Sequence, residues 1–214
     1  MKHFKLTTET KINSFGVTLF RIEATIDIQS KGIKKGEKGG FLEKEENLSG
    51  NAWVYGNAWV YGNAEVSGNA EVYGNAWVYG NARVYGDARV YGDAWVYGNA
   101  RVSGNAWVYG NAWVYGNARV YGDARVYGNA EVYGNARVSG DAICTRLAIN
   151  LIGACKWNVT GTDNHVQIGC EIKTYDEWRK WFKGSEEFET NRDSNEFKVI
   201  EKAFKLVYFQ HKSK

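Results

Sequence analysis

Residues 50–85 read GNAWVYGNAWVYGNAEVSGNAEVYGNAWVYGNARVY, a six-residue pattern that specifies the architecture of the centre of the chain. The pattern continues without insertion to GDAICT at 140–145, which makes 96 residues or 16 hexapeptides. Each unit contains Gly, then Asn or Asp, Ala, a variable residue, Val, and in most units Tyr or Ser. So short a repeat indicates stacked coils, because one unit cannot bury its apolar side alone.

Alternation within the hexapeptide assigns each position to one side of an extended segment. Ala and Val lie two apart and point to the same side, while the variable residue and the Tyr or Ser point to the other. We therefore expect Ala and Val to form the core and the variable residue to lie in the middle of an outward face. Gly followed by Asn or Asp is expected to form the corner, because these residues best tolerate positive φ.

The spacing resembles that of the left-handed parallel β-helix hexapeptide family, in which an inward aliphatic residue is followed four positions later by a small residue. Here Val54 is followed by Ala58, and Val60 by Ala64. The resemblance implies three hexapeptides per triangular coil, so that 16 units give a little over five coils. We expect a mainly β fold, with a hexapeptide β-solenoid over residues 50–145.

Residues 1–49 are expected to form a small β cap on the first coil, followed by a link. Two stretches read as strands, near residues 4–7 and 17–28. Leu48 and Ser49 already occupy the Val and Tyr positions of the repeat. A cap at this end would cover an exposed sheet edge.

Residues 146–214 are expected to cap the last coil with strands and two helices. The apolar stretches LAINLIGA and HVQIGC read as strands. Thr174 and Glu177 fit a capping box that begins the first helix. The second helix is expected from about Ser194 to the C-terminus, because its apolar residues recur at helical spacing.

Together these segments resemble a family of hexapeptide-repeat proteins often met in bacteriophage and prophage genomes. The resemblance rests on the repeats, on Phe20-Arg21-Ile22, and on residues 39–43, 46–49, 165–170 and 174–178. That family has no established common activity. The resemblance therefore implies a phage origin and the cytoplasm of a host cell, with little indication of mechanism.

Composition argues against several classes of protein. The net charge of +3 is too small to indicate a nucleic-acid binder by itself. No apolar run approaches the length needed to span a membrane, and the N-terminus lacks the apolar core of a signal peptide. Cys144, Cys155 and Cys170 match neither a zinc site nor a disulfide framework. We expect a soluble cytoplasmic protein whose three thiols are reduced and packed as small hydrophobic groups.

Residues 18 apart should stack on one face, and this spacing sorts the variable positions into three columns. We define the aromatic face as the Trp column and its neighbouring Tyr column: Trp59, Trp77, Trp95 and Trp113, then Tyr61, Tyr79, Tyr97, Tyr115 and Tyr133. The arginine face comprises Arg83, Arg101, Arg119 and Arg137, beside Ser67, Tyr85, Ser103, Tyr121 and Ser139. The mixed face comprises Trp53, Glu71, Arg89, Trp107, Arg125 and Ile143.

Two binding hypotheses follow from these columns. In the first, the Trp and Tyr side chains form a surface for a protein partner or for self-association, because exposed Trp at this density is typical of interfaces. In the second, the Arg column takes a nucleotide or another anionic ligand, and neighbouring aromatic rings stack on bases. With the phage resemblance, such a binder would act like a sponge for a host defence signal. Duplex DNA fits poorly, because residues 50–145 carry six Arg against four Asp and three Glu.

An enzyme is the third reading, since many left-handed β-helix proteins are acyltransferases. Those proteins typically use a histidine base and loops that project from the coils. Here His3, His165 and His211 lie outside the repeats, and no loop interrupts residues 50–145. We therefore expect a homo-oligomeric binding or scaffold protein that has no catalytic residue, cofactor or metal.

Overall fold

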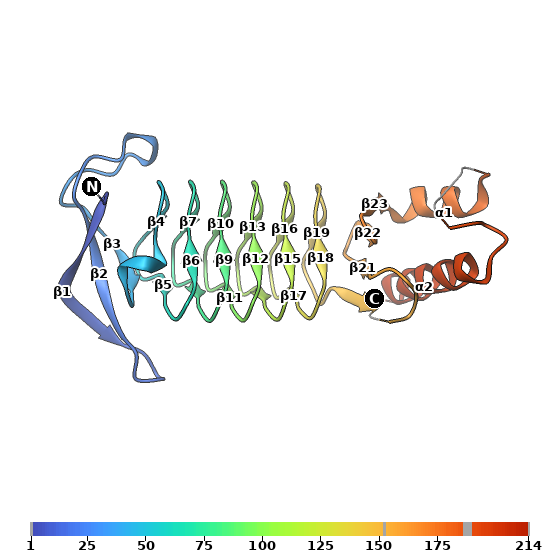
Figure 1. Cartoon of the computed structure of the whole chain (residues 1–214), viewed down its shortest axis with the longest axis horizontal. Helices are drawn as coiled ribbons and strands as arrows, with labels where there is room; N and C mark the ends of the chain where they lie inside the picture. Colours follow the sequence, from blue (N-terminus) through green and yellow to red (C-terminus); the bar gives the residue numbers. More distant parts are fainter. Residues whose placement is uncertain (1, 152, 186–189, 214) are drawn as a thin grey trace.

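Each hexapeptide contributes one two-residue strand, formed by the variable residue and the residue after it. Sixteen such strands run from β4 (Trp53–Val54) to β19 (Ile143–Cys144). The computed structural model describes residues 2–151, 153–185 and 190–213, and its strands stack into a straight rod (Figure 1). The chain termini lie in units at opposite ends of this rod.

Strands three apart in sequence pair in parallel, which produces three sheets around one core. The first contains β5 (Trp59–Val60), β8 (Trp77–Val78), β11 (Trp95–Val96), β14 (Trp113–Val114) and β17 (Glu131–Val132). The second contains β6 (Glu65–Val66), β9 (Arg83–Val84), β12 (Arg101–Val102), β15 (Arg119–Val120) and β18 (Arg137–Val138). The third contains β4, β7 (Glu71–Val72), β10 (Arg89–Val90), β13 (Trp107–Val108), β16 (Arg125–Val126) and β19.

The β-solenoid and its 18-residue coil are therefore confirmed. Trp95, for example, is in register with Trp77 on one side and Trp113 on the other. The 16 repeat strands give six positions in the third sheet and five in each of the other two, and flanking residues add a sixth parallel position to both, so the solenoid has about six turns. The added length comes from flanking residues that enter the coil: Leu48 bridges to Val66 in parallel, as its position in the repeat predicts.

Ala and Val form the core in every coil, as expected. Their exposed fractions are 0% or 1% throughout the repeats. The amides of each coil donate to carbonyls of the next, as in Asn99 N to Gly116 O (2.8 Å) and Arg101 N to Ala118 O (2.9 Å). Buried methyl groups and an unbroken backbone ladder together hold the coils in one register.

The corners depend on glycine alone, which corrects the expectation that Asn and Asp share the positive φ. Gly98 has a φ of 70°, and no non-glycine residue in the described ranges has a positive φ. A Cβ on Gly98 would also lie 3.1 Å from the backbone nitrogen of Gly116. Glycine is required both for its conformation and because successive corners approach closely. The Asn and Asp side chains have a separate role, described below.

The N-terminal residues extend the first sheet. Strands β1 (Phe4–Ile12) and β2 (Thr18–Ala24) form an antiparallel hairpin, and β3 (Lys38–Leu42) pairs antiparallel with β2 and parallel with β5. The first strand is longer and the second shorter than predicted. The prediction missed β3, because its sequence KGGFL reads as a link. Two short 3-10 turns, Gln29–Lys31 and Glu45–Asn47, complete this unit.

The C-terminal residues form an antiparallel sheet packed by two helices. The sheet contains β20 (Ile149–Leu151), β21 (Val159–Gly161), β22 (His165–Ile168) and β23 (Glu171–Thr174), and the helices are α1 (Tyr175–Lys183) and α2 (Asn195–Lys212). Both predicted helices are confirmed. The Thr174 side chain accepts a hydrogen bond from Glu177 N, and the reciprocal bond completes the capping box. Trp178, Ile200 and Phe204 belong to a hydrophobic cluster distinct from the solenoid core.

Hydrogen bonds attach this C-terminal unit to the last coil. Asn164 Oδ1 accepts from Ile143 N at 2.7 Å, and Asp163 Oδ2 accepts from Thr145 N at 2.8 Å. On the arginine face, Ser139 Oγ donates to Gln167 Oε1 at 3.0 Å. The strand groups of the final coil are therefore partly satisfied by the chain itself, which limits edge-to-edge pairing there.

No helix in the described part of the chain combines the length and the apolar composition needed to cross a bilayer. The three cysteines differ in their burial. Cys144 is buried and Cys155 is half-buried, whereas Cys170 is exposed. The expectation that all three are packed as small hydrophobic groups is wrong for Cys170, which lies at the turn between β22 and β23.

Candidate functional site

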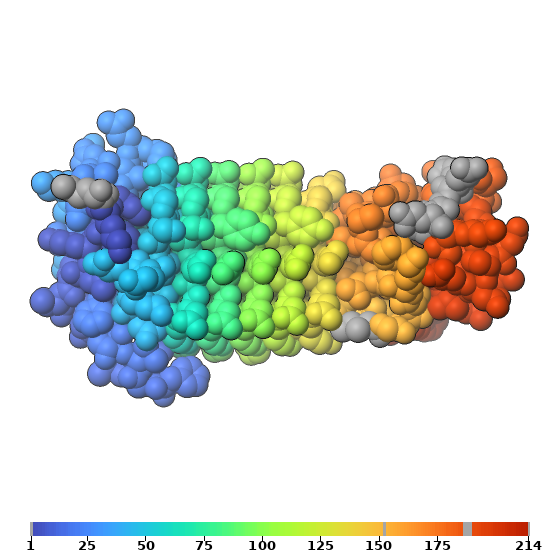
Figure 2. Space-filling model, in the orientation of Figure 1, coloured from blue at the N-terminus to red at the C-terminus, as the bar shows by residue number. Residues whose placement is uncertain are grey.

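The aromatic face is a ladder of parallel rings. Successive indoles from Trp59 to Trp113 stack with centroid distances of 4.8, 4.9 and 5.3 Å. The Tyr column beside them stacks in the same way, at 5.0 Å from Tyr61 to Tyr115 and at 5.5 Å for the last pair. Rows of side chains run along the rod in the space-filling view (Figure 2).

Stacking leaves mainly ring edges available to a partner. Trp59, Trp77 and Trp95 are half-buried, whereas Trp113 at the far end is 38% exposed. At the near end, Leu19 and Phe41 of the N-terminal unit pack against Tyr61, which is only 6% exposed. The aromatic face is thus covered at its N-terminal end and open at its C-terminal end.

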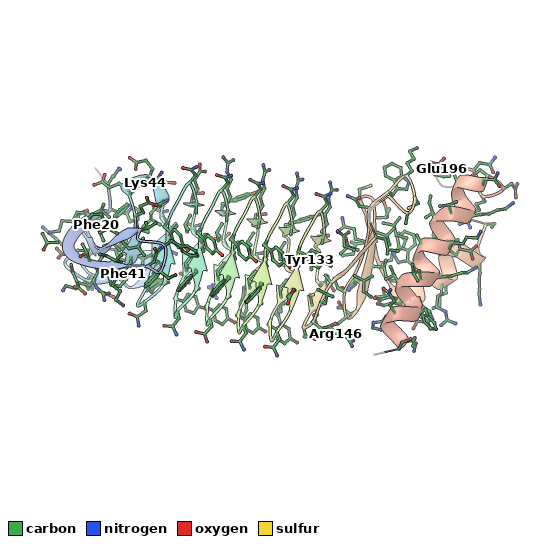
Figure 3. The ribbon with its side chains drawn as sticks, turned by 90° about the horizontal axis from the view of Figure 1, so that it is seen from below. Phe20, Phe41, Lys44, Tyr133, Arg146 and Glu196 are labelled. Atoms are coloured by element: carbon green, nitrogen blue, oxygen red, sulfur yellow. The ribbon has the colours of Figure 1, made fainter. Side chains whose placement is uncertain are left out.

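An apolar groove continues the open end of the aromatic face. This junction groove has a volume of about 520 Å³ and lies where the last coil meets β20 and the end of α2. The side chains lining it include Tyr133, Leu147, Ile149, Leu151 and Phe209. In Figure 3, Phe41 and Tyr133 lie near the two ends of the aromatic face.

The arginine face carries the second candidate site. Arg83, Arg101 and Arg119 are exposed and Arg137 is half-buried, and all four pair in register along parallel strands. A groove of about 220 Å³ lies on this face, between the Arg side chains and the neighbouring column of Tyr and Ser side chains. It is lined by Tyr85, Arg101, Ser103, Arg119, Tyr121 and Arg137. We call it the arginine groove.

An unbroken ladder of asparagine side chains forms the corner beside the arginine face. Each Nδ2 donates to the Oδ1 of the next coil, at 3.3, 3.1, 3.2 and 3.3 Å from Asn63 to Asn135. On the other two corners, Asp87, Asp93 and Asp123 accept from the preceding Asn. A carboxylate has no hydrogen to donate onward, so the ladder stops there.

The arginines of the mixed face contact neighbouring side chains of that face. Trp107 lies between two guanidinium groups, with Arg89 and Arg125 each 5.4 Å from its ring centroid. Arg89 also lies 3.6 Å from the Glu71 carboxylate. Trp53 occupies the expected outward position but is not exposed, because the N-terminal unit covers it completely, with the His3 ring 6.0 Å away.

The sequence analysis missed a second tyrosine ladder, which borders the mixed face. It runs through Tyr55, Tyr73, Tyr91, Tyr109 and Tyr127, and its last three ring pairs stack at 4.7, 4.7 and 4.9 Å. The 18-residue sorting contains this column, so the signal was present. Burial raises the pKa of Tyr55 and of Tyr61 to about 12, because desolvation disfavours the phenolate.

The structure brings the predicted site residues together within each face and keeps the two sets on different sheets. Trp59, Trp77, Trp95 and Trp113 lie with Tyr79, Tyr97 and Tyr115 on the first sheet, and Arg83, Arg101, Arg119 and Arg137 lie on the second. Sequence reasoning missed Leu147 and Phe209 of the junction groove. Phe209 lies outside the apolar stripe of its helix, a signal that marks it as an exposed aromatic residue.

The described part of the chain contains no group of three or more His, Cys, Asp or Glu that could hold a metal ion. The aromatic face, the junction groove and the arginine groove present aromatic ring edges, apolar side chains and guanidinium groups. Such groups bind through shape, burial and charge.

Comparison with known proteins agrees with the architecture. No curated protein matches the chain. The family described as YdcK Beta solenoid repeat matches at residues 82–98, 94–110, 100–116, 106–122, 112–128, 118–132 and 130–144. Over residues 82–144, which carry most of the aromatic and arginine faces, the chain is therefore similar to the YdcK β-solenoid repeat.

Proposed function

We propose that the protein is a non-enzymatic scaffold that self-associates through the aromatic face and the junction groove. The observation that carries the proposal is the open, apolar end of the aromatic face. There Phe209 is 67% exposed, Leu147 44% and Tyr133 39%. Large apolar side chains gathered around one groove are typical of protein interfaces.

A second copy of the chain is the partner that fits. The turn between β1 and β2 exposes Ile12 (69%) and Phe15 (72%), and this hairpin projects past the outline of the solenoid (Figure 1). Because β1 and β2 extend the sheet of the aromatic face, this tip and the junction groove lie at opposite ends of one surface. Two copies packed antiparallel by a two-fold axis would bring each tip to the partner's groove.

Charge favours the same arrangement. Lys11 lies beside the hairpin tip, and Glu131 continues the Trp column at the groove end. Antiparallel packing would bring these opposite charges toward each other, whereas parallel packing would place like charges together. Complementary charges fix orientation more than they add affinity.

The resemblance to bacteriophage and prophage proteins supports a further proposal about setting. A phage-encoded scaffold would act in the cytoplasm of the host cell. The similarity to β-solenoid repeats supports the scaffold class and gives no support to a particular origin.

Light scattering coupled to size-exclusion chromatography tests self-association directly. We expect light scattering to give the wild-type protein a molar mass of twice the 24.1 kDa of one chain, and to give Phe209→Asp or Leu147→Asp the mass of a monomer. Val199→Asp is the matched control, because Val199 is also exposed on α2 (39%) and does not line the groove. A wild-type monomer at high concentration would refute self-association.

Phe15→Asp tests the antiparallel arrangement. We expect this variant to be monomeric too, since the hairpin tip would meet the partner's groove. If Phe209→Asp dissociates the dimer and Phe15→Asp leaves it intact, the arrangement is wrong. Circular dichroism of each variant would establish that the solenoid remains folded.

A further inference from the structure

The arginine face contains a gap in an otherwise regular stack of rings. On the other two faces the last position of the hexapeptide is Tyr in almost every coil, and the rings of successive coils stack with centroids 4.7–5.0 Å apart in the central coils. On this face Ser103 stands between Tyr85 and Tyr121, and all three line the arginine groove. Two strand spacings of about 4.8 Å separate the two tyrosines, which leaves a space one ring thick.

Ser103 is the one serine of this column with a tyrosine on each side and open access. Ser67 precedes Tyr85, but Ser49 lies on its other side. Ser139 is 4% exposed, because Gln167 of β22 covers it and accepts its hydrogen bond. The repeat therefore builds a single two-walled gap within the described part of this face.

One wall of the gap is held in place. The Tyr121 hydroxyl accepts a hydrogen bond from Gln167 Nε2 at 3.2 Å, and Gln167 is itself only 3% exposed. The opposite wall, Tyr85, is 40% exposed. The continuous asparagine ladder holds the corner that precedes Arg101, on the other side of the arginine column from the gap. A planar group could enter beside Tyr85 and stack against a fixed ring.

The floor of the same groove carries positive charge that the chain leaves uncompensated. Among the described residues, Arg101, Arg119 and Arg137 form no ion pair with a carboxylate, whereas Arg83 lies 3.5 Å from Glu65. The arginines of the mixed face, by contrast, pack against Trp107. Guanidinium groups on adjacent strands repel one another, and an anion between them relieves that repulsion.

We propose that the arginine groove binds a nucleotide, with its base in the gap over Ser103 and its phosphates on Arg101 and Arg119. Ser103 follows Arg101 by two residues on the same side of its strand, so the stacking and charged positions are adjacent. A planar base fills the missing rung between two tyrosines, and guanidinium groups match phosphate oxygens in geometry and charge. Both features are needed to distinguish a nucleotide from a simple anion.

Isothermal titration calorimetry with ATP and with inorganic tripolyphosphate separates the two features. We expect wild-type protein to bind ATP more tightly than tripolyphosphate, and Arg119→Ala to weaken both by about tenfold or more. Added salt should weaken both ligands. Arg125→Ala, on the mixed face, is the matched control and should leave both affinities unchanged.

Ser103→Tyr is the decisive variant. It restores a residue that most hexapeptides carry at this position, so the coil should tolerate it, and its ring fills the gap. We expect ATP binding to fall by about tenfold while tripolyphosphate binding stays within about twofold. Equal affinity for the two ligands, unchanged by Ser103→Tyr, would overturn the nucleotide site in favour of a plain anion site. Absence of ATP binding at millimolar concentration would overturn the proposal altogether.

Discussion

The aromatic face and the arginine face share one backbone, one core and one register, yet their side chains interact in opposite ways. On the aromatic face each ring stacks on the ring of the next coil. On the arginine face, Arg101, Arg119 and Arg137 follow one another in register, so like charges lie on adjacent strands. Because Ala and Val beneath them are equally buried, the core does not determine what a face carries. The variable position is free to carry stacked rings on one side and like charges on another.

The side-chain interactions of the two faces contribute to the free energy of folding with opposite signs. A stacked aromatic pair contributes about 0.5–1.5 kcal/mol beyond its burial. Two guanidinium groups about 5 Å apart repel by about 1–3 kcal/mol at surface dielectrics, before screening by salt. The aromatic face therefore stabilises the rod, and the arginine face costs stability that the shared core offsets. A costly surface is the one more readily explained by a ligand.

Truncation of one residue on each face gives the largest expected contrast. Trp95→Ala removes two ring stacks, with Trp77 and Trp113, and should lower the free energy of unfolding by about 1–3 kcal/mol. Arg101→Ala should change it by less than about 0.5 kcal/mol or raise it, because it removes like-charge repulsion. Urea unfolding followed by circular dichroism measures both.

Trp113→Ala is the internal control for this contrast. Trp113 stacks on Trp95 alone, since Glu131 follows it in the column, so its loss should be about half as large. An Arg101→Ala variant less stable than Trp95→Ala would reverse the assignment of the two faces.

A smaller effect on stability is expected at the corners. There the arginine side has the continuous hydrogen-bonded ladder, and the ladder on the aromatic side is interrupted at Asp93. Asn99→Asp breaks the continuous ladder, because the new carboxylate cannot donate to Asn117, and should cost about 1 kcal/mol. Asp93→Asn joins Asn75 to Asn111 in one ladder on the aromatic side and should stabilise by about 0.5–1 kcal/mol. Thermal unfolding of the pair measures both, and shifts of the same sign would contradict a role for the ladder.

The last effect appears only at alkaline pH, at the covered end of the aromatic face. Burial raises the pKa of Tyr61 from 10.0 to about 12, so the folded chain holds this phenol proton more tightly than the unfolded chain. The resulting stabilisation is complete below pH 10 and is lost as pH rises through about 12. Tyr61→Phe should reduce the fall in melting temperature over that interval.

Neutral pH supplies the control for Tyr61→Phe. The Tyr61 hydroxyl is buried and forms no hydrogen bond with the described residues. Removing it should therefore leave stability at pH 7 unchanged or slightly higher. A destabilised variant at pH 7 would show that the hydroxyl has a partner in solution.

The repeat predicts the solenoid because the residues that recur along the sequence are the same residues that form its core. Ala and Val recur every six residues, and every one of them is buried as the alternation requires. The capping box at Thr174 was equally predictable, since its hydrogen bonds are local. Both faces followed from the 18-residue sorting, down to which rings stack.

Contacts between distant segments were not predictable in the same way. Trp53 and Tyr61 occupy outward positions of the repeat but are buried, because residues from the N-terminal unit cover them. The junction groove joins Tyr133 to Phe209, which are 76 positions apart in a chain whose intervening strands and helices have no repeat. No local pattern specifies how those elements fold back onto the last coil.

The 18-residue register has a consequence for how the gene can change length. Loss or gain of three hexapeptides would shorten or lengthen the rod by one coil and keep every downstream residue on its own face. Loss of a single hexapeptide would preserve the Ala and Val core but rotate all later positions by one face, mixing Trp with Arg along each sheet. Natural length variants should therefore differ in steps of whole coils wherever the surfaces are under selection.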